Sequence, residues 1–113
     1  MTYIQAKAGM REQMKRFLVA NWFALDEIAV KQGLMTSYRL LDTGQDAAGD
    51  AEAWNIIVIS SYRDEKGYEG IKTEFEALRK THQKVLIDGL DFRELGRIVK
   101  SQPLWESAKV GAK

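Results

Sequence analysis

Two polar side chains in this sequence interrupt apolar helical stripes, and both are of types that do chemistry. His82, the single histidine, follows Leu78 at helical spacing, and Asn21 falls within the apolar face of an earlier helix. An imidazole buried among apolar residues is neutral near pH 7, so it can take a proton from a substrate. An amide can stabilise negative charge that develops on a substrate oxygen. The sequence therefore predicts His82 as a general base and Asn21 as its catalytic partner.

We expect these two side chains to face one cavity between the helices and a sheet. The residues that we predict to line it are Trp22, Tyr38, Trp54 and Tyr62, with Arg39 placed to bind an anionic group of a substrate. Each feature also has a structural interpretation. The histidine and the asparagine can simply satisfy backbone or inter-helix hydrogen bonds, and the aromatic residues, Tyr3 included, can fill a core or a dimer interface. The arginine can pair with an acidic neighbour.

The sequence lacks the residues that other kinds of site would need. The chain has no cysteine, and a single histidine cannot build a multi-histidine metal site. The acidic segment from Asp42 to Glu52 does not have the alternating ligands of an EF-hand loop. Gly67 and Gly70 do not belong to a phosphate-binding loop, and Ser60 and Ser61 have no evident triad partners. We therefore expect neither a metal nor a cofactor.

The composition is that of one soluble domain spanning residues 1–113. Hydrophobic residues make up 45% and charged residues 29% of the chain, and the formal net charge is only +1. Such a balance argues against a nucleic-acid or membrane surface as the partner. The N-terminus has no signal-peptide pattern, and no apolar run approaches the roughly 20 residues that span a bilayer. The expected location is the cytoplasm.

The periodicity predicts the elements that must position these side chains. We expect strands at residues 2–7, 36–41, 54–62 and 93–101, and helices from 10 to about 32 and from about 71 to 86. Gly33 is placed to end the first helix, and Asp88-Gly89 signals a turn. The segment Phe92 to Leu95 fits a helix as well as it fits a strand. Residues after Trp105 have the composition of a frayed tail.

The strand from Trp54 to Tyr62 carries β-branched residues on both faces, so both faces need a cover. The element order predicts an α+β, ferredoxin-like βαββαβ fold with a four-stranded antiparallel sheet and both helices on one face. The other face is then bare. We expect a second copy of the chain to cover it, so that two sheets pack as a homodimer.

The chain resembles the dimeric α/β-barrel superfamily, in particular its antibiotic-biosynthesis-monooxygenase-like and stress-responsive members. The resemblance rests on Tyr3 to Met10 leading into a long helix, on the acidic hairpin, and on the strand Trp54 to Ile59. It implies a face-to-face homodimer and cofactor-independent oxygenation of a small molecule. Haem-degrading members use an Asn, Trp and His triad. Here the first strand has Gln5 in place of the asparagine and no tryptophan precedes His82 on its helix, so haem is disfavoured.

These observations make a homodimer that binds a small apolar or aromatic molecule the leading hypothesis, with monooxygenase-like catalysis as its enzymatic form. The alternative is a non-catalytic dimeric module for binding or interaction. RNA binding by a domain of the same topology is disfavoured, because the third strand, Trp54 to Tyr62, has aliphatic residues in its middle and no basic residue.

Overall fold

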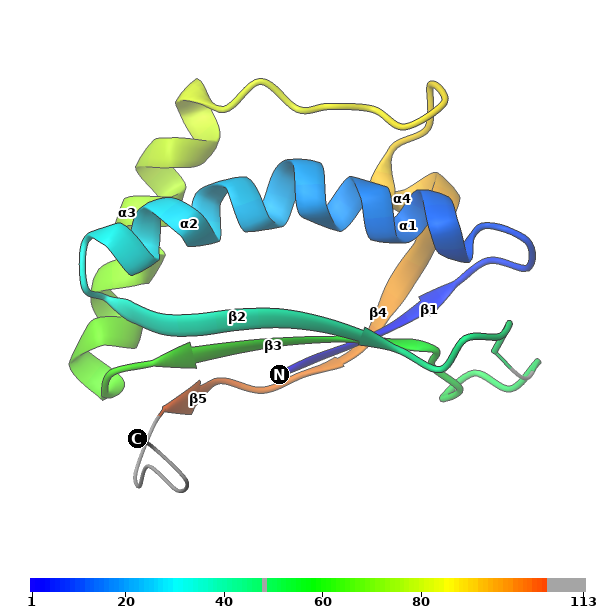
Figure 1. Ribbon diagram of the computed structural model, residues 1–113, viewed down its shortest axis with the longest axis horizontal. Coiled ribbons are helices and arrows are strands. Elements are labelled where there is room, and N and C mark those ends of the chain that lie inside the picture. Colours follow the sequence, from blue (N-terminus) through cyan, green and yellow to red (C-terminus); the bar gives the residue numbers. More distant parts are fainter. Residues whose placement is uncertain (48, 106–113) are drawn as a thin grey trace.

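A computed structural model describes residues 1–47 and 49–105 of the chain (Figure 1). The elements in order are β1 (Thr2–Ala6), α1 (Arg11–Phe17), the π-helical turn η1 (Leu18–Trp22), α2 (Phe23–Lys31), β2 (Met35–Asp42), β3 (Ile56–Tyr62), α3 (Glu65–Thr81), α4 (Phe92–Leu95), β4 (Gly96–Ser101) and β5 (Leu104–Trp105). The predicted tail after Trp105 falls on residues 106–113, which lie outside the described part of the chain.

The sheet has the predicted order of four antiparallel strands, β2-β3-β1-β4, with β1 and β3 at its centre. Ile4 of β1 lies opposite Ile56 of β3 and Ile98 of β4, which puts these three side chains on one face. All four helices lie over that face (Figure 1). The short β5, which the sequence did not predict, pairs in parallel with the end of β3. The molecule is α+β and compatible with a ferredoxin-like fold.

Two hydrophobic clusters lie between the sheet and the helices. The larger cluster joins alternate residues of β1 and β3 to one face of the first helix: Ile4, Ala6, Ile56 and Val58 pack against Met14, Phe17 and Leu18, with Ile87 and Leu95. The smaller cluster, at the other end of the sheet, consists of Ala29, Met35 and Ile71. The strand-like alternation that the sequence shows is therefore the alternation between core and open face.

The first helix runs without a break through α1, η1 and α2, but its period changes in the middle. The backbone N–H of Phe23 donates to the carbonyl of Leu18, five residues back, which marks the π turn. A π turn holds one more residue than an α turn, so every later side chain is rotated relative to a straight α-helix. Beyond it the buried positions are Asp26 and Ala29, whereas Ile28, which a straight α-helix would place on the same face as Asn21 and Leu25, is 37% exposed.

The end of this helix is the predicted one. Gly33 has a φ of 76° and follows the last residues of α2. Its N–H donates to Val30, and the N–H of Leu34 donates to Ala29, which together form a Schellman motif. The turn leads directly into β2, and so fixes the angle between α2 and the sheet.

The second helix begins and ends earlier than predicted, at Glu65–Thr81 in place of about 71–86. Its apolar face starts one turn before Ile71, because Tyr68 lies on the same side. It stops at Thr81, and residues 82–86 run extended outside the first helix. Tertiary contacts override helical propensity there, since Val85 pairs its backbone with the side chain of Asn21. His82 thus lies just beyond the helix on which it was predicted.

The first two strands differ from their predictions by one residue at one or both ends, and the last two of the four begin two or three residues later than predicted. The last strand begins at Gly96 rather than 93, because Phe92–Leu95 takes its helical alternative, with Asp91 and Glu94 forming a capping box. The third strand begins at Ile56 rather than 54, because the side chain of Asn55 is committed elsewhere. Its Oδ1 accepts from the N–H of Ala6, and its Nδ2 donates to the carbonyl of Gln45. The predicted turn at Asp88-Gly89 is present, with φ of 52° and 76°.

Gly96 has the closest surroundings among the glycines that the structure describes. A Cβ at this position would lie 2.2 Å from the carbonyl oxygen of Gln5 and 2.8 Å from Met14 Cε. We predict that Gly96→Ala lowers the free energy of unfolding by at least about 3 kcal/mol in urea denaturation, since the β1–β4 pair must separate. Gly49→Ala is the control, because nothing lies within 4 Å of its Cβ. Equal midpoints for the two variants would contradict this packing.

Candidate functional site

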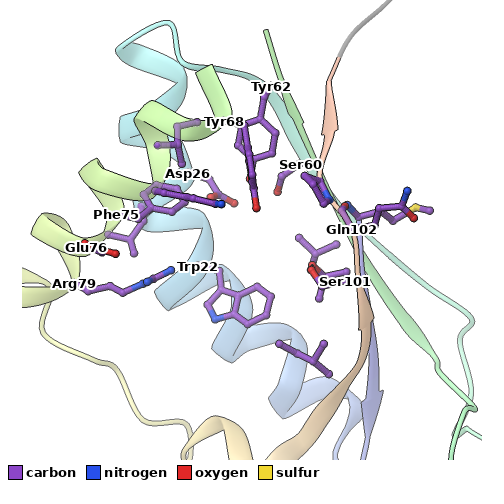
Figure 2. A pocket seen from close by; sticks show the side chains of 18 residues that line it. Trp22, Asp26, Ser60, Tyr62, Tyr68, Phe75, Glu76, Arg79, Ser101 and Gln102 are labelled. Carbon is purple, nitrogen blue, oxygen red and sulfur yellow. The ribbon is translucent and has the colours of Figure 1, made fainter. Parts of the chain in front are cut away.

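A cavity of about 520 Å³ lies between α2, α3 and the helix-side face of the sheet (Figure 2). The residues that matter for its chemistry are Trp22 of η1, Asp26 of α2, Ser60 and Tyr62 of β3, and Phe75, Glu76 and Arg79 of α3. The cavity borders both hydrophobic clusters, since Val58 of the larger one and Ile71 of the smaller one line it.

The cavity exists because the helices do not cover the whole face of the sheet. Ile98 of β4 is on the helix side, opposite Ile4, and yet it is 44% exposed. Its side chain lines the cavity, as do Thr2 and Ser101, which face each other across β1 and β4. Apolar walls with a few convergent polar groups are typical of small-molecule sites.

Asp26 is the most unusual residue of the cavity. The π turn and the i,i+4 spacing from Trp22 bring it to the cavity side of α2. The residue is only 6% exposed, and its carboxyl oxygens open onto the cavity and are not sealed in the core. The carboxyl has no hydrogen bond or ion pair within the part of the chain that the structure describes. Burial without a partner disfavours the charged form and raises the pKa of Asp26 to about 7. This carboxyl can therefore both accept and return a proton near neutral pH.

Tyr62 lies next to Asp26 in the cavity. Its hydroxyl and the Asp26 carboxyl point into the same space (Figure 2). Burial and the nearby charge of Asp26 raise the pKa of Tyr62 to about 12, so the phenol keeps its proton. The phenol is placed to donate a hydrogen bond to a ligand oxygen, while the carboxyl beside it exchanges a proton.

Flat aromatic surfaces form the rest of the wall. Trp22 is held in place by Phe92 of α4, whose ring stacks on it at 5.5 Å and 23°. Phe75 faces the same space from α3 (Figure 2). Since stacked and edge-on rings bind planar molecules well, the wall favours an aromatic ligand over a flexible aliphatic one.

The structure brings Asn21 and His82 together, with 3.1 Å between Asn21 Oδ1 and His82 Nε2. The Asn21 amide also accepts from the N–H of Val85 and donates to the carbonyls of Val85 and Phe17. Its orientation follows from the Val85 N–H, which needs an oxygen; His82 Nε2 must then be the donor. Neither residue lines the cavity. Apart from the bond to Phe17, the hydrogen bonds of the Asn21 side chain join the first helix to residues 82–85.

The remaining predicted residues are divided between the two faces of the sheet. Only Trp22 and Tyr62 line the cavity. Tyr38 packs on Phe23 at 4.8 Å in the smaller cluster. Trp54 meets Tyr3 at 5.2 Å; Tyr3 neighbours the inward-facing Ile4, so this pair lies on the opposite face. Arg39 is exposed beside the half-buried Tyr38 and has no ion pair within the described residues.

The sequence reasoning missed Asp26 because it assumed a constant helical period. On a straight α-helix the stripe of Phe17, Leu18 and Asn21 continues to Leu25 and Ile28, and Asp26 falls beside it. The observed set is Met14, Leu18, Trp22 and Asp26, each four residues apart. Periodicity alone gives no signal for this carboxyl, because its burial depends on the π turn.

Comparisons with known proteins add no identity to this geometry. No family model matches the chain, and neither a curated protein nor a solved structure matches it. In the described residues no group of three or more histidine, aspartate or glutamate side chains could hold a metal ion. No helix of the same part is long and apolar enough to cross a membrane. The site is therefore interpreted from its own chemistry.

The raised pKa of Asp26 has a consequence for stability. The unfolded value is 3.8 and the folded value about 7, so between these values the unfolded chain loses its proton first. Stability therefore falls as pH rises through this window, by up to about 4 kcal/mol, and stays reduced above it. We predict that Asp26→Asn raises the free energy of unfolding by roughly 2–4 kcal/mol at pH 8, with the gain shrinking towards zero at pH 4.

Urea denaturation at pH 4, 6 and 8 measures this gain. Glu27→Gln is the matched control, because Glu27 is the next residue on α2 and its carboxylate is exposed near Lys31. It should change stability by less than about 0.5 kcal/mol at any of these pH values. A gain for Asp26→Asn that does not vary with pH would show that the carboxyl is not buried as described.

Proposed function

We propose that this protein binds a small aromatic molecule in the cavity between α2, α3 and the sheet, and that Asp26 exchanges a proton with it. The observation that carries the proposal is the carboxyl of Asp26, which is largely buried, has no partner among the described residues and opens onto the cavity beside a phenol. The cavity is large enough for two or three fused rings. We assign the role of general base, which the sequence suggested for His82, to Asp26, because Asp26 lines the cavity.

The energetics support a functional role for this carboxyl. An asparagine has nearly the same shape and would remove the penalty of burying a charge. Groups that reduce stability without an evident structural purpose are concentrated at functional sites. By contrast, the buried Asn55 and Asn21 are fully hydrogen-bonded and serve the fold. Asp26 is the buried polar residue that the described fold does not use.

The chemistry that we propose begins with proton abstraction. Asp26 takes a proton from an acidic carbon or hydroxyl of the ring system, and the Tyr62 hydroxyl donates a hydrogen bond to the oxygen that gains negative charge. A monooxygenase-like reaction can follow without a cofactor, because an electron-rich carbanion reduces O2 directly. A ring CH2 group then becomes a carbonyl: one oxygen atom of O2 stays on the carbon, and the other leaves as water with the two hydrogens.

We also propose that the protein is a homodimer through the open face of the sheet. No described segment packs on the face opposite the helices (Figure 1). That face carries a contiguous apolar group: Tyr3, Leu41, Trp54, Ile57 and Ile59. Leu41 is 48% and Trp54 40% exposed, and apolar side chains gathered in this way are typical of an interface. Two such sheets packed face to face would bury them.

Anthrone tests the enzymatic proposal, because it is a flat tricyclic ketone whose CH2 group O2 oxidises to a carbonyl. We predict that the wild-type protein accelerates this conversion, followed by absorbance, and that Asp26→Asn lowers the rate at least about 100-fold. Glu27→Gln, which removes the exposed carboxylate of the next residue on α2, should leave the rate within about threefold, because Glu27 does not line the cavity. Equal rates for wild type and Asp26→Asn would contradict the role of Asp26. Binding of anthrone without turnover would favour the alternative function, a non-catalytic binding module.

Substitution of Ile57 tests the dimer. Ile57 lies on the open face, so we predict that Ile57→Lys gives a folded monomer in sedimentation velocity at tens of micromolar, where the wild type is a dimer. Val19→Lys is the control, because Val19 is 56% exposed on the first helix and away from the open face. Val58→Lys should instead unfold the protein, since Val58 is only 3% exposed. A monomeric wild type would overturn the proposed dimer.

A further inference from the structure

Arg79 is a second functional group at the cavity, and the chemistry proposed above does not use it. Its side chain extends from α3 towards the space above Trp22, on the opposite side of the cavity from the sheet (Figure 2). The residue is exposed, so its guanidinium lies at the rim. A ligand that enters between α3 and the sheet would pass this group before it reaches Asp26.

The guanidinium of Arg79 is free to bind a ligand. Within the described residues it has no hydrogen bond and no ion pair, and Glu76, three residues earlier, is not within ion-pair distance. It lies instead 6.0 Å from the ring of Phe75, which is part of the aromatic wall. Two other cations belong to lining residues, and both are already engaged. The Nζ of Lys72 is 4.7 Å from the Tyr68 ring and 4.0 Å from Glu69, and the N-terminal ammonium of Met1 donates to the carbonyl of Gln102.

The charges of the wall favour an anion at this rim. The side chains of α3 contribute Lys72 and Arg79 against Glu76, and Asp26 lies deeper, on the other wall. Guanidinium groups bind planar oxyanions through two parallel hydrogen bonds, a geometry that an ammonium cannot offer. A carboxylate is the commonest planar oxyanion on a small aromatic molecule. Glu76 balances only one of the two positive charges of Lys72 and Arg79, and the carboxylate of the ligand would balance the other.

We propose that the ligand is an aromatic carboxylate, bound with its carboxylate on Arg79, its ring against Trp22 and Phe75, and its reactive end at Asp26 and Tyr62. This inference rests on the proposed function for the location of the site, and it adds the substrate class. Arg79 is in this arrangement a specificity residue: it holds the charged end of the molecule at the rim, so that the uncharged end reaches the carboxyl.

Two matched probes test the proposal by isothermal titration calorimetry. 1-Naphthoate has the ring and the carboxylate, and 1-naphthamide has the same shape without the charge. We expect the wild-type protein to bind 1-naphthoate at least tenfold more tightly than 1-naphthamide. Arg79→Gln should lose at least tenfold in affinity for 1-naphthoate and leave that for 1-naphthamide unchanged. Arg79→Lys should retain part of the difference in affinity between the two probes, since lysine keeps the positive charge but cannot donate two parallel hydrogen bonds to a carboxylate.

Lys80→Gln is the control, because Lys80 is the next residue on α3 and does not line the cavity. It removes the same charge from the helix and should leave both affinities unchanged, which separates a direct contact from a general electrostatic effect. Circular dichroism melts confirm that each variant is folded. Equal affinity of the wild type for the two probes, or no loss in Arg79→Gln, would overturn the carboxylate assignment alone. Binding of neither probe would overturn both this assignment and the cavity as the site.

Discussion

The π turn at Leu18–Trp22 is the constraint on which the rest of the site depends. One extra residue in a single turn changes the phase of the helix, so that Asn21 faces outward to residues 82–85 while Trp22 and Asp26 face the cavity. The same phase change puts Ala29 into the smaller cluster and leaves Ile28 exposed. A straight α-helix with this sequence would bury Leu25 and Ile28 and turn the carboxyl of Asp26 away from the sheet.

Asn21 connects this turn to the non-helical segment that follows α3. Its amide satisfies both backbone groups of Val85, as a neighbouring strand would do, and also accepts from His82. The chain therefore leaves the helical conformation directly after Thr81 and runs alongside the first helix, on the side away from the sheet (Figure 1). Because α3 ends there, Arg79 lies in its last turn, at the rim of the cavity. One polar side chain thus links the fold of both helices to the shape of the site.

The sheet could be predicted from the sequence and the site could not, for physical reasons. Alternation along β1 and β3, the turn at Gly33 and the turn at Asp88-Gly89 are local patterns, and they led to the correct strand order. Asn21 and His82 are in contact, but the reasoning from two apolar stripes placed His82 on the second helix and both residues at a cavity, and neither holds. The end of α3 depends on a contact between residues 64 positions apart, and the position of Asp26 depends on one non-α turn. Neither has a signature in periodicity alone, because both are tertiary overrides of local preference.

The central claim is that Asp26 is a buried carboxyl that exchanges a proton near neutral pH. Its most direct test is a pH titration of the side-chain carboxyl carbon of Asp26 by NMR, with the assignment made by comparison with Asp26→Asn. The account predicts a midpoint at a pH of about 7. It also predicts that the Tyr62 ring resonances respond at the same midpoint, because the charge of Asp26 acts on that phenol. A midpoint near the ordinary value of 3.8 would contradict the account.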